Sequence, residues 1–236
     1  MTNDVQILNN GYPMPAVGLG VYKIADEQME EVVRTALDAG YRAFDTAYFY
    51  GNEKALGSAL KHSNVERDEL FITSKLWNDY QGYDQTIEYF NKSLDNLGLD
   101  YLDLFLIHWP CENDQLYIES YKALEHLYEE GKIKTIGVCN FKIHHLEKLM
   151  KETKITPQVN QIELHPYFNQ QDVQDFCDEH DIKVTAWMPL MRNKGLLDDP
   201  VITDIAHRYD KTPAQIVLRW HLAHNRIIIP KSQTPK

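Results

Sequence analysis

Cysteine is scarce in this chain of 236 residues. The three cysteines, Cys111, Cys139 and Cys177, are odd in number and do not have the spacing of a metal site. We therefore expect neither a disulfide framework nor a metal centre. Among cellular compartments, a reduced cytoplasmic setting fits this cysteine usage best.

Long apolar runs and a surplus of basic residues are also missing. No stretch approaches the ~20 apolar residues that a membrane-spanning helix needs. The first four residues, Met1-Thr2-Asn3-Asp4, show neither the basic segment nor the apolar stretch of a signal peptide. The formal net charge of −11 argues against binding to nucleic acids or acidic membranes. We expect a monomer, because no apolar surface stripe stands out.

Short apolar runs alternate with helical patterns along the whole chain. Strands are predicted at 16–20, 41–44, 71–75, 102–107, 132–138, 158–162, 182–187 and 226–229. Helices are predicted at 26–39, 53–62, 84–97, 117–130, 144–151, 171–180, 200–209 and 213–224. Residues 5–17 read as a short N-terminal β-hairpin with an Asn-Gly turn.

Eight strands separated by helices predict an α/β fold, a (β/α)8 TIM barrel, in one domain spanning residues 1–236. A doubly wound open sheet is the alternative. Such a sheet usually carries a glycine-rich phosphate loop after its first strand. The stretch from Val17 to Tyr22 has two glycines and no third at the required offset, which favours the barrel.

Polar side chains follow three successive strand ends. Asp45 ends one strand, and Tyr50 lies five residues further on. Lys75 ends the next strand, and His108 follows the third. Taken singly, each has an ordinary structural explanation: a packed aromatic, a turn aspartate, a capping lysine or a core histidine. Because the C-terminal ends of barrel strands meet at one face, we expect the four to lie together.

Five motifs, in this order, resemble the aldo-keto reductase family, in particular its bacterial branch that reduces diketo-gluconates and glyoxals. They are Asp45-Thr46-Ala47 with Tyr50-Gly51-Asn52-Glu53, Thr73-Ser74-Lys75, Ile107-His108-Trp109-Pro110, Ile136-Gly137-Val138-Cys139-Asn140-Phe141 and Ile229-Pro230-Lys231-Ser232. The family has serine where this chain has Cys139, and often where it has Met188. Relatives also continue past Lys236, so we expect the final helix and the C-terminal loop of the barrel to be absent from this chain.

The resemblance implies NADPH-dependent reduction of small aldehydes and ketones, such as glyoxals and keto sugars, by hydride transfer. Tyr50 would donate the proton, Lys75 would lower the pKa of Tyr50, Asp45 would hold Lys75, and His108 would orient the carbonyl. The implied cofactor residues are Asn140, Gln161, Trp187, Lys231, Ser232, Cys139, Leu190 and Val21. The implied substrate residues are Tyr22, Trp77, Trp109 and His108.

Two other functions use the same residues. The chain would serve as a sensing subunit if it bound the cofactor without turnover. It would act as a Schiff-base lyase if Lys75 were the nucleophile, although an aspartate beside the lysine keeps it charged and opposes that role. Glu163 and His165 lack a third ligand at useful spacing, so we interpret them as structural and predict no metal.

Overall fold

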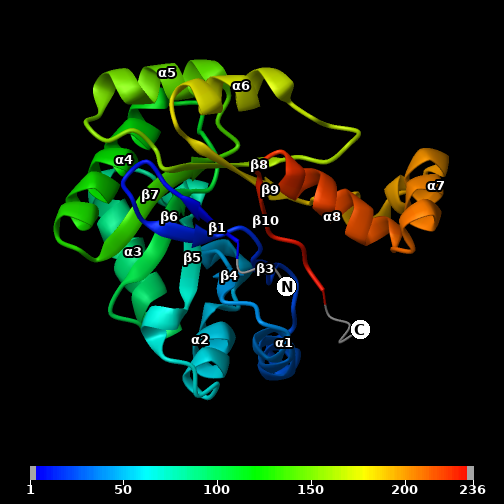
Figure 1. The fold of residues 1–236 in the computed structure, drawn as a ribbon. Coiled ribbons are helices and arrows are strands. Elements are labelled where there is room, and N and C mark those ends of the chain that lie inside the picture. Colours follow the sequence, from blue (N-terminus) through cyan, green and yellow to red (C-terminus); the bar gives the residue numbers. More distant parts are fainter. Residues whose placement is uncertain (1–3, 233–236) are drawn as a thin grey trace.

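The computed structural model describes residues 4–232, and a barrel of parallel strands lies at its centre (Figure 1). The barrel strands are β3 Leu19–Gly20, β4 Ala43–Asp45, β5 Phe71–Leu76, β6 Leu102–Ile107, β7 Ile133–Cys139, β8 Val159–Glu163, β9 Lys183–Trp187 and β10 Ile227–Ile228. Each strand pairs with the next one along the chain, so the order in space follows the order in sequence. This is the predicted (β/α)8 barrel.

The first and last strands close the barrel. Val17 forms a parallel bridge with Ile228, and the backbone nitrogen of Gly20 donates to the carbonyl of Pro230 over 3.1 Å. A Cβ on Gly20 would lie 2.9 Å from the carbonyl oxygen of Ile229. The seam therefore needs a residue without a side chain at this position.

Helices surround the barrel (Figure 1). They are α1 Asp26–Asp38, α2 Glu53–Lys61, α3 Tyr83–Leu97, α4 Asp114–Glu129, α5 Ile143–Glu152, α6 Gln171–Glu179, α7 Pro200–Tyr209 and α8 Pro213–Ala223. Both α7 and α8 lie between β9 and β10, and they extend to one side in Figure 1. Within residues 4–232, α8 is the last helix. None of the described helices is long and apolar enough to cross a bilayer.

Two predicted elements start elsewhere than expected. The first barrel strand begins at Leu19, not at residue 16. Residues 16–18 meet the last strand only through the isolated bridge of Val17 with Ile228, and the nitrogen of Ala16 donates to the carbonyl of Asp4. Helix α4 begins at Asp114, not at residue 117, because the side chain of Asn113 caps the nitrogen of Gln115 over 3.1 Å. The other predicted barrel strands and helices start and end within two residues of the observed ones.

The predicted hairpin is present and covers the N-terminal end of the barrel. Its strands, β1 Val5–Ile7 and β2 Pro13–Pro15, pair in antiparallel fashion. Leu8 and Met14 are buried and pack with the barrel-interior residue Phe71. One end of the barrel is thereby filled.

The two-residue period of a strand explains why the other end is polar. Ala43, Leu106 and Val159 belong to the apolar interior of the barrel. Two residues further on, the same inward positions hold Asp45, His108 and Gln161. The interior is therefore apolar towards the N-terminal ends of the strands and polar towards the C-terminal ends, where barrel enzymes keep their active sites.

Candidate active site

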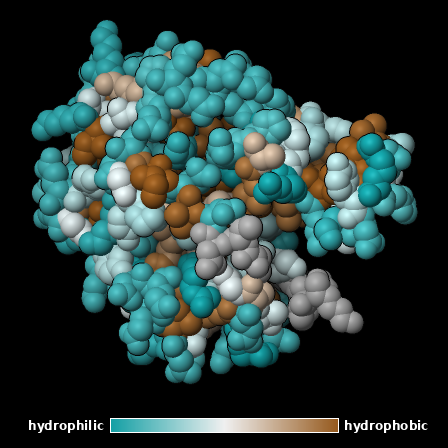
Figure 2. Space-filling model, in the orientation of Figure 1, coloured by the Kyte–Doolittle hydropathy of each residue, from teal (hydrophilic) through white to brown (hydrophobic). Residues whose placement is uncertain are grey.

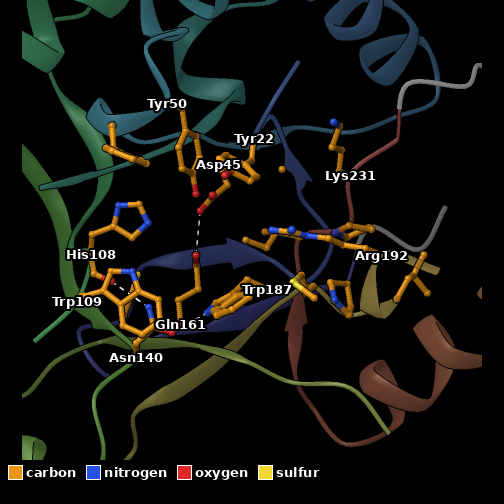
Figure 3. Close-up of a pocket in the computed structure, with 18 of the residues that line it drawn as sticks. Tyr22, Asp45, Tyr50, His108, Trp109, Asn140, Gln161, Trp187, Arg192 and Lys231 are labelled. Carbon is orange, nitrogen blue, oxygen red and sulfur yellow. Dashed lines mark hydrogen bonds between the residues drawn. The ribbon is translucent and has the colours of Figure 1, made fainter. Parts of the chain in front are cut away.

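A cavity of about 360 Å³ opens at the C-terminal ends of the barrel strands (Figure 3). The site residues predicted from the sequence that line it are Tyr22, Asp45, Tyr50, Trp77, His108, Trp109, Cys139, Asn140, Gln161, Trp187, Leu190 and Lys231. Lys75 is fully buried and contacts the lining residue Asp45. The structure therefore brings the residues from the separate strand ends together.

A buried ion pair forms the floor of the cavity. The ammonium of Lys75 donates to Oδ1 of Asp45, and it also donates to the carbonyl of Thr46 over 2.7 Å. Burial is the largest single influence and lowers the pKa of Lys75, but the charge of Asp45 and its hydrogen bond, together with Tyr50 and Cys139, outweigh burial, and the net pKa lies above the ordinary value. Lys75 is therefore a permanent cation at this position.

Tyr50 is held above this pair by a short turn. Residues Tyr48–Tyr50 form one 3₁₀ turn, which ends at Gly51 with φ of 72°. The next residue, Asn52, accepts a hydrogen bond from Thr46 and donates one to the carbonyl of Val21, both over 2.9 Å. These bonds tie the Tyr50 loop to the loop after β3.

The electrostatic setting of Tyr50 differs from the expected one. Burial raises the pKa of Tyr50 to about 12, and the charge of Lys75, which lies 5.2 Å from the centre of the Tyr50 ring, opposes this rise. The predicted lowering by Lys75 is present, but burial is the larger effect. Tyr50 is therefore a protonated phenol at neutral pH.

His108 is a neutral imidazole over the same range. Burial, followed by the charge of Lys75, lowers the pKa of His108 to about 3. Its Nδ1 is buried and has no hydrogen-bond partner among residues 4–232. Nε2 is the ring nitrogen left to a molecule in the cavity.

Two amides and an indole form one wall (Figure 3). Asn140, at φ of 62°, donates from Nδ2 to the carbonyl of His108 over 3.0 Å and accepts from Nε1 of Trp187 over 2.8 Å. Gln161 donates from Nε2 to Oδ2 of Asp45 over 2.9 Å. Cys139 also lines the cavity, and burial raises the pKa of its thiol, which stays neutral.

Aromatic rings surround the mouth beside His108. Trp77 stacks on Phe49 with ring centres 3.8 Å apart and meets His108 edge-on at 5.2 Å. Phe49 lines the cavity although it was not predicted, and its side chain is half exposed. Its position directly before Tyr50 was a usable sequence signal.

Basic side chains gather at the other end of the cavity. The guanidinium of Arg192 lies 5.7 Å from the centre of the Tyr22 ring, and the ammonium of Lys23 lies 5.3 Å from it. Lys231 donates to the carbonyl of Lys23 over 3.2 Å. Burial, and then the charges of Lys23 and Arg192, lower the pKa of Lys231.

These three cations have no carboxylate partner within residues 4–232. Arg192 was missed by sequence reasoning, because it lies in an irregular loop and adopts a left-handed φ of 50°. No regular periodicity indicates where such a side chain points.

Two predicted cofactor residues do not line the cavity. The side chain of Val21 is fully buried in the core, and its carbonyl accepts from Asn52. Ser232 is exposed beside Lys231. In the part of the chain that the structure describes, no three His, Cys, Asp or Glu side chains gather as metal ligands.

Known proteins are similar to this chain in sequence and in fold. The model of the aldo/keto reductase family matches residues 16–236. The glyoxal reductase of Bacillus subtilis (strain 168) is 49% identical over 230 residues, which cover 97% of this chain and 82% of that protein. The methylglyoxal reductase DkgA of Escherichia coli (strain K12) is 48% identical over 229 residues, with coverage of 97% and 82%.

Solved structures of aldo-keto reductases have the same fold as this chain. An aldo/keto reductase from Brucella melitensis matches with a TM-score of 0.96 at 47% identity, over 99% of this chain and 90% of that chain. A mutant of Gox0644 in complex with NADPH matches with a TM-score of 0.94 at 42% identity, over 100% of this chain and 85% of that chain.

Proposed function

Because the chain belongs to the aldo/keto reductase family, we propose that it reduces small aldehydes and ketones to alcohols with NADPH, glyoxals and keto sugars among them. The observation that carries the proposal is the buried Asp45–Lys75 pair next to Tyr50, in a cavity that His108 also lines. A proton donor and a carbonyl-orienting group thus share one cavity.

The amide wall suits the carboxamide of a nicotinamide. Nε2 of Gln161 is committed to Asp45, so Gln161 has its Oε1 left as an acceptor. Asn140 uses one Nδ2 hydrogen on His108 and keeps the other as a donor. A carboxamide needs one partner of each kind. The indole of Trp187, held by Asn140, offers a flat face for the ring.

Tyr50 supplies the proton in this proposal. Bound NADPH supplies the hydride, so the chain itself must protonate the oxygen of the reacting carbonyl. With a pKa of about 12, Tyr50 carries its proton at neutral pH. Lys75 stabilises the tyrosinate that donation leaves behind, and Asp45 keeps the ammonium in place.

His108 orients the substrate. As a neutral imidazole with Nε2 free, it can donate a hydrogen bond to the carbonyl oxygen. Trp77, Trp109 and Tyr22 line the cavity around it with apolar surface. This arrangement admits a small carbonyl compound and limits the access of water.

The basic end of the cavity suits the phosphates of the cofactor. Lys231, Arg192 and Lys23 bring three positive charges to one place and have no carboxylate partner within residues 4–232. Arginine and lysine are the side chains that hold phosphate oxygens best. We extend the prediction for Lys231 to Arg192 and Lys23, which adds support for NADPH over NADH.

The test is NADPH consumption with methylglyoxal by the parent and the Tyr50→Phe variant. We expect kcat to fall by about 10²- to 10⁴-fold, because a general acid is removed, with NADPH binding measured by fluorescence unchanged. Tyr48→Phe is the matched control. Tyr48 belongs to the same turn but packs edge-on against Tyr80 and Tyr89. Retention of kcat by Tyr50→Phe would overturn the assignment of the proton donor.

The two other functions give different outcomes. A parent that binds NADPH but does not turn over any tested carbonyl would favour the sensing subunit. Trapping of Lys75 by borohydride with substrate would indicate a Schiff-base lyase. The buried, charged state of Lys75 beside Asp45 weighs against that lyase.

We also propose a cytoplasmic monomer. The three cysteines are free, which agrees with a reduced compartment. On the face in Figure 2, hydrophilic residues predominate and hydrophobic ones lie in separate small groups. Light scattering would test the oligomeric state.

A further inference from the structure

Gln161 makes a contact that cofactor binding alone does not require. Its Nε2 donates to Oδ2 of Asp45 over 2.9 Å, although 116 residues separate the two in sequence (Figure 3). The two side chains are almost fully buried, with 3% of Gln161 and 4% of Asp45 exposed. Because a carboxylate oxygen can only accept, this bond decides which way the amide points.

The contact extends a chain of polar groups that leads to Tyr50. Among residues 4–232, each oxygen of Asp45 has one side-chain donor, Lys75 on Oδ1 and Gln161 on Oδ2. The ammonium of Lys75 lies 5.2 Å from the centre of the Tyr50 ring. The amide on β8 is thus connected through Asp45 and Lys75 to the proton donor after β4.

We propose that Gln161 is a positioning residue for proton transfer: its Nε2 holds Asp45 against Lys75, while its Oε1 serves the cofactor. The inference rests on the proposed function and deepens it. One side chain links the place where the cofactor binds to the ion pair that sets the acidity of Tyr50.

The direction of the effect follows from the charges. The N–H of Gln161 partly compensates the negative charge of Asp45, and that charge disfavours a tyrosinate at Tyr50. Without this N–H, Tyr50 keeps its proton to higher pH. The other titratable groups that face the pair are Cys139 on β7, His108 after β6 and Tyr22 after β3, and the substitution leaves them in place.

The experiment compares Gln161→Met with Gln158→Met. Methionine has a similar length and no N–H. Gln158 is also buried, but it bonds to Asn9, Thr156 and Ile136, near the N-terminal end of β8. It therefore reports the general cost of removing a buried amide, away from the cavity.

The first measurement follows the Tyr50 ring directly. The ¹³Cζ signal of labelled tyrosine, assigned with Tyr50→Phe, gives the ionised fraction of Tyr50 at pH 11, which we expect to be about a tenth in the parent. We expect Gln161→Met to lower this fraction about threefold, and Gln158→Met to leave it unchanged. This readout needs neither cofactor nor turnover, so it stands if the proposed function fails.

The second measurement is the pH dependence of turnover. In the NADP⁺-dependent oxidation of an alcohol, the pH of half-maximal kcat should rise by about half a unit in Gln161→Met, because the tyrosinate is the required base. Weaker NADPH binding with an unmoved Tyr50 signal would overturn the proposal and leave Gln161 as a cofactor contact. An equal change in Gln158→Met would also overturn it.

Discussion

Each end of the barrel holds a buried aspartate that is paired with a cation and accompanied by a tyrosine. At the N-terminal end, Asp103 accepts from Arg67 over 2.7 Å, and from the hydroxyl of Tyr12 and the nitrogen of Ile72 over 2.8 Å each. The donors come from the hairpin, from the segment before β5 and from β5 itself. We call Asp103 and Arg67 the lower pair; Asp103 joins the hairpin, β5 and β6 at the N-terminal end of the barrel.

At the C-terminal end, Asp45 accepts from Lys75 and Gln161, and the hydroxyl of Tyr50 is not bonded to the aspartate. Tyr12 gives its proton to a hydrogen bond with Asp103, whereas Tyr50 lines a cavity. An aspartate, a cation and a tyrosine therefore join elements of the fold at one end, and at the other end they form the proposed proton-transfer site. The difference lies in where the phenol points.

The largest expected effect is on kcat, which should depend on the cation at the C-terminal end of the barrel and not on the cation at the N-terminal end. Lys75→Met should lower kcat by about 10²- to 10⁴-fold, because the tyrosinate loses its counter-charge. It should also destabilise the protein, since Asp45 is left buried and unpaired. The double variant Asp45→Asn with Lys75→Met should regain stability without regaining kcat.

In the pair at the N-terminal end, Arg67→Met should lower stability and leave kcat per folded molecule unchanged. Equal losses of kcat in the two single variants would break the comparison.

The lower pair is tested next by stability. Asp103→Ala should reduce the free energy of unfolding by about 3–5 kcal/mol, because three donors, the charged Arg67 among them, lose their acceptor. Urea unfolding measures this, with exposed Asp100→Ala as the control. The folded fraction of Asp103→Ala should keep its KM and kcat. A change below 1 kcal/mol would show that the lower pair does not pin the fold.

The pH dependence of stability tests the buried histidine, His108, at the C-terminal end of the barrel. His108 has a pKa of about 3 in the folded protein, against about 6.5 in an unfolded chain. As the pH falls from 6.5 towards 3, His108 is therefore protonated in the unfolded chain but stays neutral in the folded protein. The free energy of unfolding decreases as a result. His108→Asn should weaken this loss by about 2–3 kcal/mol between pH 7 and 4.5. Urea unfolding at both pH values measures it, with exposed His207→Asn as the control. An unchanged slope would contradict a neutral His108.

The barrel and its polar end were predictable, because strand periodicity is local. Ala43 and Asp45 share a face by their spacing alone, and the strand ends that carry Asp45, Lys75 and His108 were identified from the chain. The Gln161–Asp45 bond was not, since it joins residues 116 apart. The net direction of the shift in the Tyr50 pKa could not be predicted either. It depends on the burial of the ring, which cannot be read from the sequence. The left-handed φ of Arg192 likewise leaves no periodic signal.

The smallest expected effect concerns two arginines. Arg67, at the N-terminal end of the barrel, has a carboxylate partner, whereas Arg192, at the basic end of the cavity, has none within residues 4–232. A cation without a partner is available to a ligand. Arg192→Met should raise the Kd for NADPH about tenfold, which is about 1.4 kcal/mol, and leave kcat at saturation unchanged. Fluorescence titration at two salt concentrations measures it, because a phosphate contact weakens as salt rises. Arg208→Met is the matched control, since Arg208 pairs with Asp204 on the exposed side of α7. An unchanged Kd would show that Arg192, although it lines the cavity, does not hold the cofactor.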